Sequence, residues 1–210
     1  MSGKIIRVWD PLVRLFHWSL LVAFIVAWLS GEEESLVHAY AGYAILGLVG
    51  FRIVWGLVGS RYARFSNFLY SPGRTARYMR SLTSRNPEHY TGHNPAGGWM
   101  IMLLLGSLLI AVYTGLEVYG AEGQGPLADG SPGVEWIATA RADADSDDEH
   151  ESGHENGAEE FWEELHELSA NLTLFLVFVH IAGVLVGSYV HRENLVRAMI
   201  TGRKRVSAEE

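Results

Sequence analysis

Four apolar segments, each long enough to cross a lipid bilayer, constrain the fold of this chain more than any other feature. A helix needs about 20 apolar residues to span the hydrocarbon core. The four segments are residues 11–30, 36–59, 99–119 and 168–190. Backbone polar groups inside a bilayer must be paired within the protein, which favours helices for runs of this length. We therefore expect an all-α fold, a four-helix transmembrane bundle in a single membrane domain.

The first segment has some features of a signal peptide, because Lys4, Arg7 and Arg14 precede or open it. No small-residue cleavage site follows it, however, and residues 32–34 are three glutamates. A secretory signal would end in such a site. We expect this segment to be retained as the first membrane helix.

Charged residues are segregated along the chain and indicate its orientation. Arginines and lysines gather before the first segment, between the second and third, and after the fourth. The other two connections contain one basic residue, Arg141, and most of the acidic residues. Loops rich in Lys and Arg remain in the cytoplasm. The chain is thus expected to be a multi-pass membrane protein with both termini and the middle loop in the cytoplasm.

Two of the connections have distinctive compositions. In the middle loop, Pro72-Gly73 is typical of a turn, and residues 75–82 combine helical apolar spacing with arginines. This pattern fits a short helix on the anionic lipid surface, and it fits a solvated basic loop equally well. Residues 120–164 form a long acidic insertion, expected on the periplasmic side. Its low hydrophobicity over residues 140–157 predicts loose order there.

The chain has no cysteine. This excludes disulfides, thiolate metal sites and iron–sulfur clusters, and it excludes the C-x-x-C-H motif that attaches haem covalently. A haem in this chain would have to be held by side chains such as His or Met.

Four of the nine histidines lie in or beside the apolar segments: His17, His38, His166 and His180. An ionisable side chain inside a membrane span is costly and marks a functional site by default. For each histidine taken alone, a hydrogen bond to a neighbouring helix is an equally good explanation. The four positions taken together favour metal ligation.

The spacing of these histidines predicts two pairs. His166 and His180 are 14 residues apart, close to four helical turns, so they share a helix face with a rise of about 21 Å between them. The predicted orientation puts His38 and His166 on the outer side, and His17 and His180 on the inner side. Two histidines facing each other across a bundle can supply both axial ligands of one haem, which suits electron transfer. We expect two non-covalent haems b.

Other residues support a haem site less directly. Gly42 and Gly183 could admit a flat macrocycle, or could serve ordinary helix packing. Arg52 could pair with haem propionates, or its side chain could extend to the cytoplasmic interface. His89 and His93 are expected to be solvated, and His191 to be interfacial. His150 and His154 could bind a divalent metal if their acidic run were helical, although a solvated loop is the simpler expectation.

Three stretches resemble the bacterial cytochrome b561 family, which includes the b-type cytochrome subunits of nickel–iron hydrogenases. They are VWDPLVRLFHWSLL, HAYAGYAILGLVGFRIVWGLVGSRYARFSNF and VHIAGVLVGS, and the run from Arg52 to Phe65 is the most specific. The resemblance implies two haems b in a bacterial inner-membrane bundle, with His17, His38, His166 and His180 as ligands. It also implies electron transfer between a periplasmic redox protein or enzyme subunit and membrane quinone.

Three functions follow as hypotheses. The leading one is a dihaem electron-transfer subunit whose acidic outer loop docks a basic redox partner. The second is a stand-alone oxidoreductase that passes electrons from a small molecule such as superoxide to quinone, so whether the chain is itself an enzyme stays open. The third is a divalent-metal transporter or sensor. None of these has a nucleic-acid partner, and membrane lipid is expected around all of them.

Overall fold

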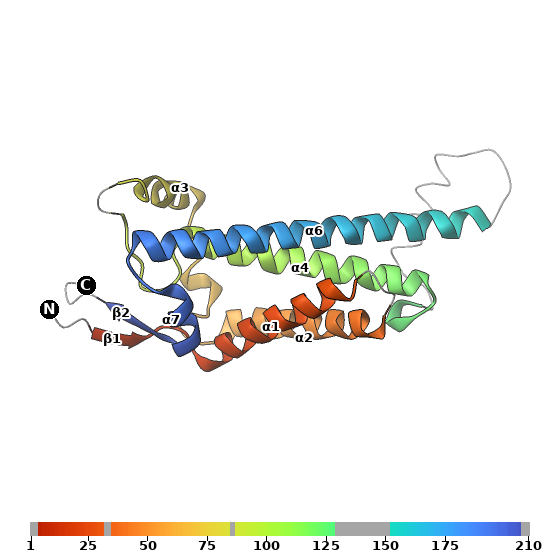
Figure 1. Cartoon of the computed structure of the whole chain (residues 1–210), viewed down its shortest axis with the longest axis horizontal. Helices are drawn as coiled ribbons and strands as arrows, with labels where there is room; N and C mark the ends of the chain where they lie inside the picture. Colours follow the sequence, from red (N-terminus) through yellow and green to blue (C-terminus); the bar gives the residue numbers. More distant parts are fainter. Residues whose placement is uncertain (1–3, 32–34, 85–86, 129–151, 207–210) are drawn as a thin grey trace.

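The computed structural model describes residues 4–31, 35–84, 87–128 and 152–206. Four long helices run side by side as an elongated bundle (Figure 1): α1 (Pro11–Leu29), α2 (Leu36–Val58), α4 (Pro95–Ala121) and α6 (Ser152–Val190). Each contains a stretch long and apolar enough to cross a membrane, and in α6 that stretch is Glu160–Val190. The expected all-α, four-helix membrane bundle is confirmed.

Three of these helices begin at residues whose side chains complete the first turn. Asp10, Ser35 and Asn94 occupy the N-cap positions of α1, α2 and α4, and each accepts a hydrogen bond from the backbone N–H three residues later. Such caps satisfy donors that have no partner within the helix. Proline follows Asp10 and Asn94, where its missing N–H costs nothing.

The bundle is built from two helix pairs, α1 with α2 and α4 with α6, and α2 also packs against α4. Its small core contains Phe16, Ile45, Val49, Leu105 and Leu108. Many other apolar side chains point outward; Leu29, for example, is 78% exposed and Phe175 is 62% exposed. An apolar exterior of this kind suits contact with lipid.

One end of the bundle, which we call the basic end, carries both ends of the described chain (Figure 1). Strands β1 (Lys4–Arg7) and β2 (Arg203–Val206) pair antiparallel there. The short helices α3 (Pro72–Ser81) and α7 (Leu195–Thr201) lie at the same end. We call the opposite end, where α1 leads to α2 and the 3₁₀ turn η2 (Gly125–Leu127) follows α4, the acidic end.

The structure decides between the two alternatives for the middle loop and moves one helix boundary. The middle loop contains the expected short helix, α3, which contacts α4 and has a buried tyrosine, so the alternative of a solvated basic loop is wrong. Helix α6 begins at Ser152, well before the predicted span at 168. Residues 152–157 are therefore helical rather than loosely ordered, while residues 140–151 lie outside the described part.

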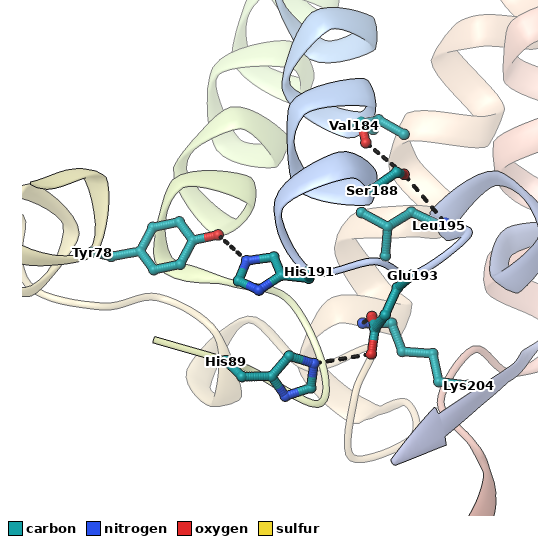
Figure 2. A network of polar contacts seen from close by, with 8 residues as sticks. All are labelled: Tyr78, His89, Val184, Ser188, His191, Glu193, Leu195 and Lys204. Atoms are coloured by element: carbon teal, nitrogen blue, oxygen red, sulfur yellow. Dashed lines mark hydrogen bonds and ion pairs between the residues drawn. The ribbon is translucent and has the colours of Figure 1, made fainter. Parts of the chain in front are cut away.

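At the basic end, polar contacts join α3 and the loop that follows it to the residues after α6 and to β2 (Figure 2). The Tyr78 hydroxyl lies 3.2 Å from His191 Nε2, and His89 Nε2 lies 2.9 Å from a Glu193 carboxylate oxygen. Lys204 Nζ lies 2.9 Å from the other Glu193 oxygen. The sequence predicts that His89 is solvated. In the structure its ring instead contacts Glu193, which follows the end of α6.

Candidate histidine-pair site

Four histidine rings face each other in two pairs between the helices. The ring centroids of His38 on α2 and His166 on α6 are 5.9 Å apart, at the acidic end. Those of His17 on α1 and His180 on α6 are 6.4 Å apart, closer to the basic end. These are the two pairs that the predicted topology brings together, and α6 contributes one histidine to each.

The spacing of the rings matches what a shared metal ion requires. A bond from a metal ion to an imidazole nitrogen is about 2 Å long, so two imidazoles on opposite sides of one ion have ring centres roughly 6 Å apart. Both observed distances are close to this value. At Gly42 and Gly183, no heavy atom lies within 4 Å of the position that a Cβ would take. The open space beside these glycines is compatible with a bulky flat ligand.

The rings of the acidic-end pair are oriented by backbone carbonyl groups. His38 Nδ1 lies 2.9 Å from the Ala27 oxygen of α1, and His166 Nδ1 lies 2.9 Å from the Ala111 oxygen of α4. A carbonyl can only accept, so in each ring Nδ1 carries the proton. Nε2 is then left with its lone pair, which is the tautomer needed for metal ligation.

Several buried nitrogens without a hydrogen-bond partner lie toward the basic end, and one more, Trp162 Nε1, lies near the start of the α6 span. Among the described residues, the buried side-chain nitrogens without a hydrogen-bond partner include Arg14 Nε, His17 Nδ1, Arg52 Nη1 and His93 Nδ1. Buried polar groups are rarely left unpaired, and such groups need a specific explanation. A ligand with carboxylate groups, as haem b has, would supply acceptors for the two guanidinium groups, those of Arg14 and Arg52.

Arg52 remains inside the bundle instead of extending to the surface. Its side chain is 3% exposed, and its Nη2 donates to the Ala63 carbonyl oxygen at 3.1 Å. The guanidinium group lies over the Phe65 ring, 4.8 Å from the centroid. Gly56 makes this possible, because a Cβ there would stand 2.1 Å from the Phe65 ring. The conformation of Arg52 thus depends on a neighbouring loop.

His93 belongs to the same region, although the sequence suggested a solvated loop position. Its ring lies between those of Trp9 and Phe68, with both centroid distances 4.4 Å. Burial, together with the nearby cations Arg52 and Lys204, lowers the pKa of His93 to about 3. The ring is therefore neutral at ordinary pH. In the sequence, the one sign that His93 is not a solvated loop residue is its position directly before Asn94, the N-cap of α4.

No group of three or more His, Asp or Glu side chains suited to a metal ion occurs in the described ranges. His150 lies outside those ranges, so the suggested metal site at His150 and His154 is not tested.

Comparisons with known proteins agree with these observations. The family model described as prokaryotic cytochrome b561 matches residues 8–202. A probable Ni/Fe-hydrogenase B-type cytochrome subunit of Rhizobium leguminosarum bv. viciae is 23% identical, with 95% of this chain and 88% of the relative covered. A protein of the same description from Cupriavidus necator is 25% identical, with 96% and 88% covered. No solved structure gives a significant match.

Proposed function

Because the chain belongs to the prokaryotic cytochrome b561 family, we propose that it carries electrons across a bacterial inner membrane by means of two b-type haems, each held by two histidines. Bound haem supplies reversible one-electron chemistry. The protein supplies the ligands, their spacing and the electrostatic surroundings. The observation that carries this proposal is the pairing of four histidine rings at 5.9 and 6.4 Å.

His38 and His166 would hold one haem at the acidic end, and His17 and His180 would hold the other toward the basic end. Two histidines on one iron leave no free coordination position, which favours electron transfer over binding of a small ligand. Because α6 provides one histidine to each pair, His166 and His180 would hold the two haems at positions about four turns, or about 21 Å, apart along this helix.

At the basic end, Arg52 and its neighbours would bind the propionate groups. A buried guanidinium next to a carboxylate forms strong charge-assisted hydrogen bonds. Gly42 and Gly183 would lie against the macrocycles. We place the quinone reaction near this end as well, close to Arg52 and the basic middle loop, where a headgroup could approach from the bilayer.

The redox partner belongs to the opposite side of the membrane in this proposal. The positive-inside rule puts the basic end in the cytoplasm and the acidic end in the periplasm. Both relatives are described as hydrogenase cytochrome subunits, which suggests a periplasmic enzyme subunit as the electron donor. Exposed glutamates on the first turns of the α6 span give that side a negative surface. Complementary charge would mainly accelerate encounter.

Haem stoichiometry tests the proposal directly. The purified chain is expected to contain two haems b by the pyridine haemochromogen assay. His38→Ala and His166→Ala should each lose the same haem, and His17→Ala and His180→Ala should each lose the other. Loss of one and the same haem in His17→Ala and His38→Ala would contradict the pairing. A purified protein without a Soret band would defeat the cytochrome function and favour a metal transporter or sensor.

Activity without a partner separates the two redox hypotheses. If the purified single chain, given no second protein, reduced quinone with superoxide at a catalytic rate, the stand-alone oxidoreductase would replace the subunit function. Reduction that requires an added redox protein supports the proposal.

A further inference from the structure

Helix α4 contains no histidine, yet three of its residues surround the His166 ring. The Ala111 carbonyl oxygen lies 2.9 Å from His166 Nδ1, and Thr114 Oγ1 lies 3.2 Å from the same nitrogen. A Cβ added to Gly115 would stand 2.9 Å from His166 Cε1 and 3.2 Å from Nδ1. The ring therefore rests directly against the backbone of α4.

Further hydrogen bonds fix the position of the Thr114 hydroxyl. It lies 3.0 Å from the Ile110 carbonyl oxygen and 3.1 Å from that of Ala111, to either of which it can donate. It also lies 3.3 Å from Ser169 Oγ, and Ser169 donates to the His166 carbonyl oxygen at 2.9 Å. Thr114 is 1% exposed and Ser169 is 5% exposed. Because these groups are buried and mutually bonded, their arrangement is rigid.

We propose that Ala111, Thr114 and Gly115 form a seat on α4 that holds the His166 ring in one tautomer and one orientation, and thereby sets how readily the acidic-end haem is reduced. This inference rests on the haem ligation proposed above. These three are positioning residues, since they act through His166.

The chemistry of the second shell gives the direction of the effect. A hydrogen bond from Nδ1–H to an acceptor makes Nε2 a more basic ligand. A more basic ligand stabilises the ferric ion more than the ferrous ion, and so lowers the reduction potential. His17 Nδ1, in the other pair, has no hydrogen-bond partner among the described residues. The seat therefore acts on one haem and not on the other.

Gly115→Ala is the principal test, with Gly106→Ala as its matched control. Both substitutions add one methyl group to α4, but no heavy atom lies within 4 Å of the Gly106 position. In a spectroelectrochemical titration of the full chain, Gly115→Ala should raise the midpoint potential of one haem and leave the other unchanged. We expect about a tenfold change in the reduction equilibrium, which for one electron is about 59 mV. Gly106→Ala should alter neither potential.

Gly115→Ala could expel the acidic-end haem altogether. That outcome would support the seat, provided that Gly106→Ala kept both haems. Two substitutions of Thr114 then test the potential. Thr114→Val removes one acceptor while keeping the shape, and should shift the same potential in the same direction by less. Thr114→Ser should restore it. Unchanged potentials in both Gly115→Ala and Thr114→Val, or equal shifts of both haems, would overturn the inference. By contrast, a parent protein with no haem, or His166→Ala with two, would defeat the proposed function itself.

Discussion

The Asp10 carboxylate connects three parts of the basic end. One oxygen accepts from the Val13 N–H at 2.8 Å, which caps α1. The other accepts from Trp55 Nε1 at 3.2 Å, near the end of α2, and from the Ser60 hydroxyl in the following loop. Burial alone would raise the pKa of Asp10, but these hydrogen bonds hold it below its ordinary value overall. A single side chain thus joins the start of the first span to the end of the second.

Replacing Asp10 by alanine should destabilise the protein more than the loss of an ordinary helix cap. We expect a loss of about 2–3 kcal/mol, because the cap is removed and the Trp55 and Ser60 donors lose their acceptor. Thermal unfolding in detergent, followed by circular dichroism, measures this. Asn194→Ala, which removes only the exposed cap of α7, should cost about 1 kcal/mol. Equal losses in the two variants would show that the contacts to Trp55 and Ser60 contribute little.

His93 should make the stability of the basic end depend on pH. Its pKa is about 3 in the folded protein, whereas an unfolded histidine titrates near 6.5. Between these values the unfolded state binds more protons, so the free energy of unfolding falls as the pH falls. From pH 7 to pH 5 the loss attributable to His93 is at most about 2 kcal/mol. His93→Phe, which keeps a ring between Trp9 and Phe68, should show a smaller decrease in Tm over this range. An identical decrease would contradict the prediction.

Helix α3 contacts the rest of the protein through its buried tyrosine, Tyr78, and through Arg74, whose Nε donates to the Tyr90 hydroxyl at 3.3 Å. Tyr78 is 1% exposed, and its hydroxyl contacts His191 at the end of α6 (Figure 2). Burial raises the pKa of this hydroxyl to about 12, so it remains protonated and can donate to His191. The exposed arginines of α3 then face outward, where anionic lipid headgroups would lie.

Tyr78→Ala should therefore release α3 from the bundle, since a large buried ring is worth about 3–5 kcal/mol. Trypsin, which cleaves after arginine, is expected to cut at Arg74, Arg77 and Arg80 much faster in this variant than in the parent protein. Tyr78→Phe keeps the ring and loses only the hydrogen bond, so it should be cut at nearly the parent rate. Equal protection of all three proteins would mean that other contacts hold α3.

The first turns of the α6 span present exposed glutamates at positions 160, 163, 164 and 167. If the acidic end docks a basic redox protein, replacing all four by glutamine should lower the rate of electron delivery and reduce its dependence on ionic strength. The measurement is stopped-flow reduction by a basic c-type cytochrome at increasing salt. Haem content and reduction by an uncharged quinol serve as controls and should not change. A rate insensitive to salt in the parent protein would rule out this docking role.

Over the whole molecule, the two histidine pairs lie one after the other along α6, so electron transfer across the membrane should require both. In liposomes with an oxidant enclosed and a reductant outside, His38→Ala and His17→Ala should each abolish transfer, although each should retain one haem. The Gly106→Ala variant should transfer electrons at the parent rate. Transfer that survives the loss of either pair would show that the two sites do not act in series.

The sequence alone was enough to predict the four spans and the two histidine pairs. Apolar length predicts membrane helices because the bilayer has a fixed thickness. The 14-residue spacing of His166 and His180 puts them on one face because the helix repeat is regular. The segregation of charge then predicts the orientation of each span, and therefore which histidines lie on the same side of the membrane. Each of these inferences depends on local chain geometry or on the membrane, and not on how side chains pack.

Only the tertiary structure determined the surroundings of those histidines. The seat on α4 contacts His166 on α6, and the ring contacts of His93 with Trp9 and Phe68 join residues from three separate segments. The pairing of β1 with β2 joins the two ends of the described chain. Such contacts link residues far apart in the sequence, and each depends on the exact distance between two helices or a helix and a loop. The distance between two elements cannot be predicted from hydrophobic periodicity or charge, because it depends on the close packing of side chains throughout the bundle.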